Sequence, residues 1–181
     1  MTVSPNETFA AVFFDRDGTL MREVNYCGDP KHVEVFSDAA SALRKLKEHG
    51  YKLIIVTNQS GIGRGFFSEE VYRKVQDELI RQLGEGLIDA TYFCPDLPDV
   101  NSARRKPSPE MVFEAQRENH LDLSRSFFIG DKAIDVQCGR NAGVRTVLMQ
   151  TGYGAEETEC RPDWIARDLS HAAEIMLAHQ R

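Results

Sequence analysis

Two aspartates stand one residue apart directly after an apolar run near the beginning of the sequence. Residues 11–14 read Ala-Val-Phe-Phe, and Asp15, Asp17 and Gly18 follow at once. The run predicts a buried strand, and in a parallel α/β sheet ligands bind at the carboxyl ends of strands. Two carboxylates this close repel each other unless one takes up a proton or a cation lies between them. Mg²⁺ prefers carboxylate oxygens and substrate phosphate, so the pair predicts a magnesium site. The alternative is an aspartate-rich turn in which Gly18 supplies a positive φ.

A second polar cluster follows the apolar run 52–56. Thr57 offers a hydroxyl, and the small residues up to position 65 offer backbone N–H groups that can surround an anion. The spacing of Gly61, Gly63 and Gly65 fits neither the dinucleotide-binding pattern nor the phosphate loop of nucleotide hydrolases. We therefore expect anion binding at this strand end, with a flexible glycine turn as the alternative.

Two further clusters bring the charges that phosphate chemistry needs. Arg105 and Lys106 belong to a basic loop, which alone is more often a solvated patch. Asp131 and Asp135 follow the apolar run 126–130 and stand four residues apart, so at a helix start they share one face. Carboxylates, a hydroxyl and basic side chains at the ends of one sheet suit phosphoryl transfer. In that reaction charge develops on the phosphoryl oxygens and must be neutralised.

The elements that position these clusters alternate between strand and helix. We expect helix caps at Ser37 and Ser68, and helix ends near Gly50 and Gly143. The alternation is typical of a Rossmann-like, doubly wound α/β fold, which is a parallel sheet with helices on both faces. The length fits a single domain over residues 1–181. The expected strands are 11–14, 52–56, 87–94, 126–130, 145–149 and an edge strand at 163–166, with a short extended piece at 31–36. The expected helices are 37–50, 68–83, 108–119, 136–142 and 169–179.

Composition narrows the classes of partner. The chain has 41% hydrophobic and 28% charged residues and a net charge of -6, which argues against a nucleic-acid partner. The first eight residues lack the features of a signal peptide, and no apolar run reaches the roughly 20 residues of a membrane span. The four cysteines are scattered, as expected for free thiols. We expect a cytoplasmic monomer that binds neither membrane nor nucleic acid.

Four motifs in order resemble the haloacid dehalogenase superfamily of phosphatases. They are Asp15-x-Asp17-Gly-Thr, a strand ending in Thr57-Asn58, then Lys106-Pro107, and finally Gly130-Asp131 followed by Asp135. Any one of them is weak evidence, but four in order at strand ends are specific and cover nearly the whole chain. The sequence around these motifs is similar to that of the D-glycero-D-manno-heptose 1,7-bisphosphate 7-phosphatases and the related histidinol-phosphate phosphatases.

The resemblance implies roles for individual residues. Asp15 would be the nucleophile that forms an aspartyl-phosphate. Asp17 would protonate the leaving sugar oxygen and then activate the water. Thr57 and Lys106 would hold the phosphoryl oxygens. Mg²⁺ would be held by Asp15, the main-chain carbonyl of Asp17, and Asp131, with Asp135 orienting this group. The residues implied to contact the rest of the substrate are Glu23, Asn25, Tyr26, Asn58, Gln59, Ser60, Arg105 and Lys132.

The sequence departs from the family pattern at a zinc-binding loop. The family commonly carries Cys-x-His followed by Cys-x-Cys, whereas this chain keeps Cys94 and has Asp96, Ser102 and Arg104 at the other positions. One thiolate cannot make a closed four-ligand site, so zinc is not expected. Arg105 would then reach outward to the second phosphate of a sugar bisphosphate. Arg104 would either add a second cation there or lie in solvent.

A cap domain is not expected either, although superfamily members often insert one. The segments between the motifs are too short to hold it, so the site should be open, with residues 21–31 as a partial rim.

These observations favour a Mg²⁺-dependent phosphatase that removes the 7-phosphate of a phosphorylated sugar, D-glycero-D-manno-heptose 1,7-bisphosphate. Histidinol phosphate or another small phosphate ester is the alternative substrate. A polynucleotide 3′-phosphatase is disfavoured by the acidic net charge. The non-enzyme alternative is a scaffold that binds a phosphate ligand on the same fold. The presence of Asp15, Asp17, Lys106 and Asp131 argues against it.

Overall fold

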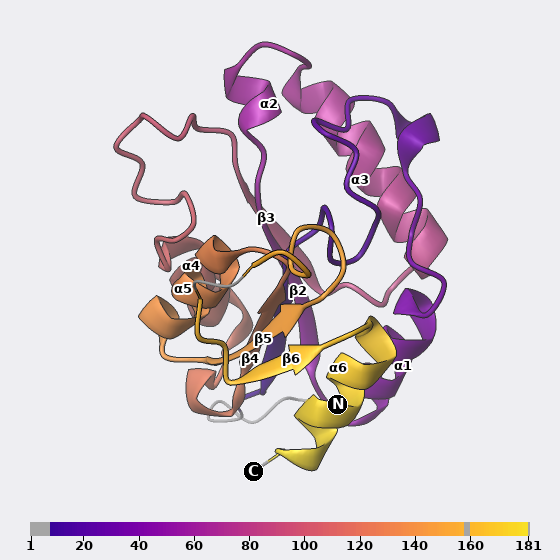
Figure 1. Cartoon of the computed structure of the whole chain (residues 1–181), viewed down its shortest axis with the longest axis vertical. Helices are drawn as coiled ribbons and strands as arrows, with labels where there is room; N and C mark the ends of the chain where they lie inside the picture. Colours follow the sequence, from indigo (N-terminus) through magenta and orange to yellow (C-terminus); the bar gives the residue numbers. More distant parts are fainter. Residues whose placement is uncertain (1–7, 158–159, 181) are drawn as a thin grey trace.

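The protein is built around a six-stranded, entirely parallel sheet (Figure 1). The computed structural model describes residues 8–157 and 160–180, so both ends of the expected domain 1–181 lie outside the described residues. The strands lie in the order β3-β2-β1-β4-β5-β6. Their bounds are β1 Ala11–Phe14, β2 Lys52–Asn58, β3 Ala90–Cys94, β4 Phe127–Gly130, β5 Arg145–Met149 and β6 Trp164–Ala166.

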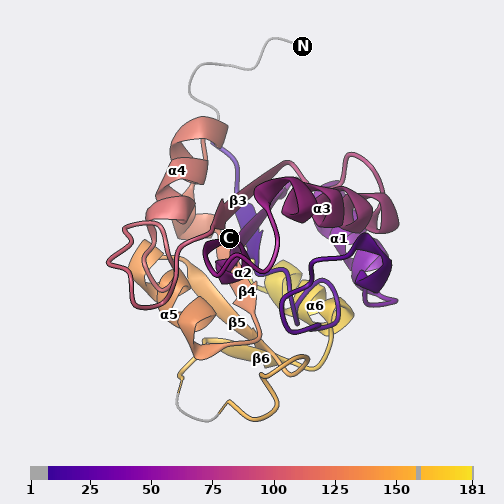
Figure 2. The same ribbon diagram turned by 90° about the horizontal axis from the view of Figure 1, so that it is seen from above.

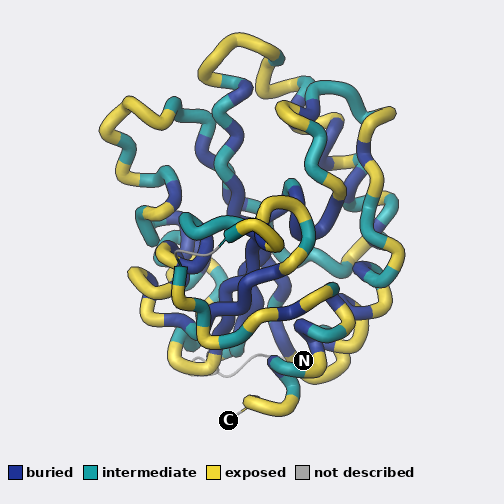
Figure 3. The backbone as a smooth tube through the Cα atoms, viewed as in Figure 1, coloured by how far each residue is buried: buried dark blue, intermediate teal, exposed yellow. Residues whose placement is uncertain are grey.

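Helices cover both faces of the sheet, which confirms the expected doubly wound architecture (Figure 2). Along β1, Val12 and Phe14 pack into one apolar core with α1, α3 and α6, whereas Ala11 and Phe13 pack into the other with α4 and α5. Figure 3 shows these strands as the buried centre of the molecule. The helices are α1 Ala39–Glu48, α2 Ser60–Gly63, α3 Glu69–Leu83, α4 Glu110–Asn119, α5 Ala133–Ala142 and α6 Leu169–Ala178, with 3-10 turns η1 Pro30–His32 and η2 Leu123–Arg125.

Several expected boundaries need correction. Helix α1 begins after Asp38, not after Ser37, and the Asp38 carboxylate accepts a hydrogen bond from the distant Ser170 backbone instead of capping its own helix. The expected extended piece at 31–36 is instead the turn η1, capped by the Asp29 side chain, followed by a single bridge between Met21 and Val35. Local pattern could not anticipate the contact between Asp38 and Ser170, because the two residues are 132 positions apart in the chain. Strand β3 begins at 90, not 87, and helix α4 at 110, not 108.

The strand order places the site. The chain moves outward from β1 through β2 to β3, and then returns to the other side of β1 to form β4, β5 and β6. Ligands in such sheets bind outside the carboxyl ends of the strands, where this reversal opens a crevice. Asp15 directly follows β1 and Asp131 directly follows β4, and these two strands are hydrogen-bonded neighbours. The fold therefore brings together two carboxylates that are 116 positions apart in the chain.

No cap domain is inserted in the part of the chain that the structure describes. The connection from β1 to α1 holds a loop and η1, and the connection from β2 to β3 holds α2 and α3. The site is therefore not covered by a cap domain, as expected. Within the described ranges, the helices are all too short or too polar to cross a bilayer.

Candidate active site

Four buried, charged side chains form the floor of the site. Lys106 Nζ lies 2.7 Å from Asp15 Oδ1 and 2.7 Å from Asp135 Oδ1. All three side chains are buried, and the most exposed of them, Asp15, has 7% of its side-chain area exposed. Asp131 is fully buried beside them. The ligand oxygens of Asp15, Asp131 and Asp135 lie within 4.8 Å of one another. The loops after β1 and β4, the first turn of α5 and the loop before α4 thus converge on one charged cluster.

The floor contains three carboxylates and one ammonium group, that of Lys106. Burial, together with the Asp15 carboxylate, raises the pKa of Asp131 to about 7. Burial also raises the pKa of Asp135, although Lys106 works against that shift. Burial works to lower the pKa of Lys106, but the carboxylates of Asp135 and Asp15 outweigh it and raise that pKa. Three buried carboxylates therefore face one buried ammonium group, and burial disfavours the anionic form of Asp131 and Asp135.

The donor set fits a magnesium ion. Asp131 Oδ1 is buried and has no hydrogen-bond partner among the described residues. A buried carboxylate oxygen without a partner is costly, and a bound cation removes that cost. All three clustered side chains offer oxygen, which is the ligand that Mg²⁺ prefers. Asp17 does not belong to this cluster through its side chain, so its expected contact through the main-chain carbonyl stays a prediction.

Asp17 is held by a residue to which sequence analysis gave no role. Arg16 is completely buried and binds both carboxylate oxygens of Asp17, at 2.9 and 3.1 Å. Gln59 accepts from Arg16 at 3.0 Å and donates to Asp17 at 2.8 Å. Burial works to raise the pKa of Asp17, but the Arg16 guanidinium outweighs it and holds that pKa below its usual value. Asp17 is therefore fixed in place.

The end of β2 positions the lysine. Asn58 donates its side-chain amide to the Lys106 carbonyl at 3.1 Å and accepts from the Lys106 backbone N–H at 3.0 Å. The neighbouring Thr57 is buried, and its hydroxyl accepts from Gln59 at 2.9 Å. The side-chain amides of Asn58 and Gln59 thus position catalytic candidates, and their expected contact with substrate stays a prediction.

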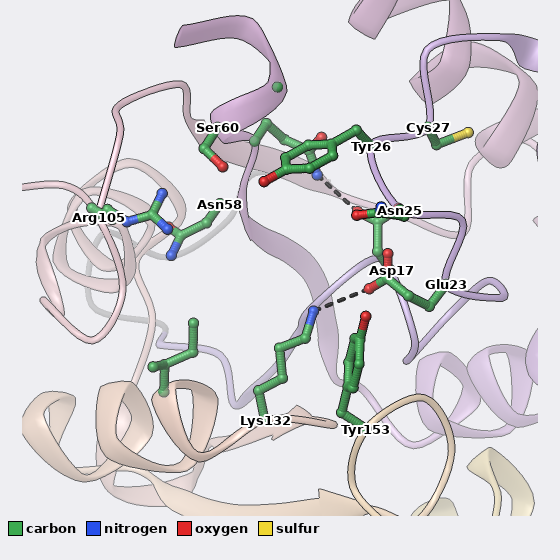
Figure 4. Close-up of a pocket in the computed structure, with 13 residues that line it drawn as sticks. Asp17, Glu23, Asn25, Tyr26, Cys27, Asn58, Ser60, Arg105, Lys132 and Tyr153 are labelled. Atoms are coloured by element: carbon green, nitrogen blue, oxygen red, sulfur yellow. Dashed lines mark hydrogen bonds and ion pairs between the residues drawn. The ribbon is translucent and has the colours of Figure 1, made fainter. Parts of the chain in front are cut away.

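A cavity of about 340 Å³ lies next to this floor (Figure 4). All eight residues expected to contact the substrate line it, together with Asp17. Lys132 and Glu23 face each other across one side, with Lys132 Nζ 3.1 Å from Glu23 Oε2. Tyr26 lies on another side, in the left-handed region at φ 65, with its ring edge-on to Phe66. The expected substrate residues therefore share one cavity.

The loop between β3 and α4 carries the arginine that faces this cavity. Arg105 Nη1 donates to the Asp96 carbonyl at 2.7 Å, which directs the guanidinium. Ser102 Oγ donates to Asp96 Oδ2 at 2.5 Å and accepts from the Arg105 backbone N–H at 3.3 Å. Cys94 Sγ lies 3.4 Å from the same Asp96 oxygen. The residues at the family's zinc-ligand positions thus join in a hydrogen-bond network, which we call the 94–105 network.

Arg104 does not add a second cation to the cavity. Its guanidinium binds both carboxylate oxygens of Glu114 on α4, at 2.9 and 2.7 Å, and Arg104 does not line the cavity. Of the two roles left open for Arg104, the one at the substrate is therefore wrong.

Sequence analysis also missed Tyr153, Ile134 and Cys27 among the cavity residues. Tyr153 had a signal, since it follows β5 just as the other site clusters follow their strands.

Comparisons with known proteins agree with this geometry. The family described as HAD-hydrolase-like matches residues 103–172. The chain is 41% identical over 145 residues to a probable D-glycero-D-manno-heptose-1,7-bisphosphate 7-phosphatase of Thermoplasma acidophilum, covering 78% of this chain and 91% of that one. It is 34% identical to the D-glycero-beta-D-manno-heptose-1,7-bisphosphate 7-phosphatase of Yersinia pestis, covering 97% and 99%.

A solved structure is also similar. It is the D,D-heptose 1,7-bisphosphate phosphatase from B. bronchiseptica complexed with magnesium and phosphate, with a TM-score of 0.86 and 29% identity. The match covers 93% of this chain and 98% of that one. On these similarities over nearly full length, the chain belongs to the D-glycero-D-manno-heptose-1,7-bisphosphate 7-phosphatase family of HAD-like hydrolases.

Proposed function

We propose that the protein is a Mg²⁺-dependent phosphatase that removes the 7-phosphate of D-glycero-D-manno-heptose 1,7-bisphosphate through an aspartyl-phosphate intermediate. The observation that carries the proposal is the charged floor beside a polar cavity. Asp15 is held at 2.7 Å by Lys106, while Asp17, Arg105 and Lys132 line the adjoining space. Its support from other proteins is the activity named for relatives that match nearly the whole chain.

Asp15 attacks the phosphorus atom, and the bond from phosphorus to the sugar oxygen breaks. The leaving oxygen takes a proton from Asp17, which then removes a proton from the water that hydrolyses the acyl phosphate. Lys106 and Thr57 bind phosphoryl oxygens at the floor. Asp15, Asp131 and the Asp17 carbonyl would hold Mg²⁺, which would supply positive charge for the phosphoryl group.

Asp135 and the Arg16–Gln59 pair act as positioning groups in this proposal. Asp135 accepts from Lys106 and from the Lys132 backbone N–H at 3.1 Å, so it orients both lysines. Arg16 and Gln59 hold the carboxylate of Asp17 from one side. The reacting side chains are thereby placed before substrate arrives, which lowers the entropic part of the barrier.

The second phosphate of the sugar bisphosphate gives the cations at the cavity wall a role in binding. When one phosphate binds at Asp15, the other lies near the cavity wall, where Arg105 and Lys132 are available. A guanidinium binds phosphate through two parallel hydrogen bonds. Because no cap encloses the site, selectivity depends on such contacts.

The decisive experiment is a substrate panel assayed with and without Mg²⁺. It compares heptose 1,7-bisphosphate, histidinol phosphate and a 3′-phosphorylated oligonucleotide. We expect the highest kcat/KM for the heptose bisphosphate and no turnover in the presence of a chelator. A higher kcat/KM for histidinol phosphate or the oligonucleotide would assign the enzyme to that substrate class. No turnover of any phosphate ester would favour the scaffold.

The proposal includes a monomer in the cytoplasm that binds neither nucleic acid nor membrane. Its support is the net charge of -6 and four cysteines without disulfides, which suit a reducing compartment. Sedimentation velocity tests the oligomeric state.

A further inference from the structure

The turn after β5 is anchored to the floor of the site. The Tyr153 backbone N–H donates to Asp131 Oδ2 at 2.9 Å, and Thr151 Oγ1 donates to the Gly18 carbonyl at 2.7 Å. The Gly154 N–H closes the turn by donating to the Thr151 carbonyl at 2.9 Å. These bonds tie residues 151–154 to the loops after β1 and β4, so the turn has a fixed position beside Asp131.

Two glycines make this close approach feasible. A Cβ on Gly152, which has φ +51, would collide with the Asp131 carboxylate. A Cβ on Gly154 would collide with the Met149 carbonyl. A backbone that fits against its neighbours only with glycine on both sides of Tyr153 leaves that residue little freedom to move. Tyr153 is thus presented by a rigid turn.

The Tyr153 side chain does not pack in the apolar core. It is 49% exposed, yet it lines the cavity that holds Asp17 and Lys132. Lys132 Nζ lies 4.9 Å from the centre of the ring, within the range of a cation–π contact. In Figure 4 the rings of Tyr153 and Tyr26 lie on opposite sides of the drawn cavity. The cavity wall therefore has aromatic surface on two sides of a space lined otherwise mainly by polar groups.

Such surface matches a part of the substrate that the charged groups cannot recognise. The phosphates and hydroxyls of a cyclic sugar bind to cations and hydrogen-bonding groups. Its C–H face carries a slight positive charge and is apolar. An aromatic ring offers a negative face and a large apolar area, so it packs against that surface. A rigid ring also loses little entropy when it does so, which favours binding.

We propose that Tyr153 contacts the substrate and selects for a cyclic sugar, its ring packing on the C–H face of the sugar while the second phosphate binds to Arg105 and Lys132. This inference rests on the proposed function for its natural substrate. An open-chain phosphate presents no such face and gains nothing from the ring. The contact comes from the side chain alone, because the backbone N–H to Asp131 remains after substitution.

The test compares a cyclic ligand with its reduced, open-chain form, glucose 6-phosphate with sorbitol 6-phosphate. Each is measured as a competitive inhibitor of p-nitrophenyl phosphate hydrolysis, so that neither needs to be turned over. We expect wild type to bind the cyclic ligand about tenfold more tightly. Tyr153→Ala should remove that difference and leave Ki for the open-chain ligand within about twofold. Tyr153→Phe keeps the ring and should behave as wild type.

The matched control is Ile165→Ala on β6, which removes an equally exposed apolar side chain away from the cavity. It should leave both Ki values unchanged. An equal loss on both ligands in Tyr153→Ala, or no loss on either, overturns the inference. So does a loss in Tyr153→Phe as large as in Tyr153→Ala. If wild type fails to hydrolyse heptose bisphosphate, the proposed function fails, while this ligand pair still decides the role of Tyr153.

Discussion

Lys106 binds two carboxylates at once, and the proposed Mg²⁺ ion would add the further positive charge at the floor. Its ammonium group lies 2.7 Å from both Asp15 and Asp135, so one positive charge is shared between two negative ones. Asp131 adds a third carboxylate with a free buried oxygen. Removing one partner of a buried ion pair leaves a charge unbalanced, at a cost of about 3–5 kcal/mol. Substitutions on the floor should therefore keep the shape of the side chain.

Asp15→Asn is such a substitution. The amide keeps the shape and still offers an oxygen to Lys106, but it cannot attack phosphorus. We expect kcat to fall by about 10³-fold or more, since neighbouring residues offer no replacement for a lost nucleophile. Steady-state kinetics on the best substrate measures the loss, and acid quenching with labelled substrate measures the phosphorylated enzyme. Near-normal turnover in Asp15→Asn, or label that persists in it, would contradict this role.

Arg105 acts at the wall of the cavity and not at the floor. We expect Arg105→Ala to lower kcat/KM for a sugar bisphosphate by at least about tenfold, roughly 1.4 kcal/mol. The loss for a simple monophosphate ester should be much smaller, because that substrate has no second phosphate. Arg105→Lys should recover only part of the loss, since an ammonium group cannot bind phosphate through two parallel bonds.

The control for Arg105 is its neighbour. Arg104→Ala removes a guanidinium that binds Glu114 outside the cavity, so it should leave the ratio of the two substrates unchanged. Equal losses on both substrates in Arg105→Ala would show that Arg105 serves the reacting phosphate or the fold.

At the scale of elements, the segment from β3 to α4 holds Arg105 by hydrogen bonds. In the 94–105 network, Ser102 links the Asp96 side chain to the backbone N–H groups of Arg104 and Arg105. The Asp96 carbonyl in turn accepts from the Arg105 guanidinium. The direction of Arg105 therefore depends on the shape of the loop.

Ser102→Ala tests this dependence without touching the cavity, because Ser102 does not line it. We expect KM for the bisphosphate to rise severalfold while kcat and the monophosphate kinetics stay the same. Hydrogen exchange should become faster in residues 95–105. Ser124→Ala, which removes another hydroxyl bonded to an aspartate, is the control. Elemental analysis should find no stoichiometric zinc; about one zinc per chain, or unchanged exchange in Ser102→Ala, would contradict the network's role.

Sequence patterns predicted elements well where local chemistry decides them. Ser68 caps α3 as expected, and β5 has the expected bounds 145–149. Apolar runs that lie between two helix layers leave little choice but strand. The start of α1 was misplaced because Asp38 is engaged by Ser170, which no local window contains.

The sequence predicted which residues belong to the site, but not how their side chains are hydrogen-bonded to one another. The motifs brought the right residues to one cavity, yet they gave no sign that the side chains of Asn58 and Gln59 bind Lys106 and Asp17. Arg16 lies between two aspartates, and sequence alone does not tell a buried guanidinium from an exposed one. The glycines on either side of Tyr153 indicate a loop, and this pattern does not predict that the Tyr153 side chain lines the cavity.

At the scale of the whole molecule, the proposed metal site joins two halves of the fold. Asp15 ends the strand that begins the first half, and Asp131 ends the strand that begins the second. An ion bound to both therefore exists only when β1 and β4 are paired. Binding to the folded state alone stabilises it by about 2.7 kcal/mol when the ligand is present at one hundred times its Kd.

For a chain of this size, that gain corresponds to an increase in Tm of roughly 5–10 °C. We expect saturating Mg²⁺ to raise the Tm of metal-free wild type by about this amount. Asp131→Asn should lose most of the increase. Without Mg²⁺ its Tm should not fall below that of wild type, because the substitution removes one of three crowded negative charges. Asp122→Asn, on the surface turn η2, should keep the full increase. Differential scanning calorimetry with and without a chelator measures all three proteins. Equal Tm values for wild type with and without Mg²⁺ would mean that the three carboxylates are balanced by protons and not by a metal ion.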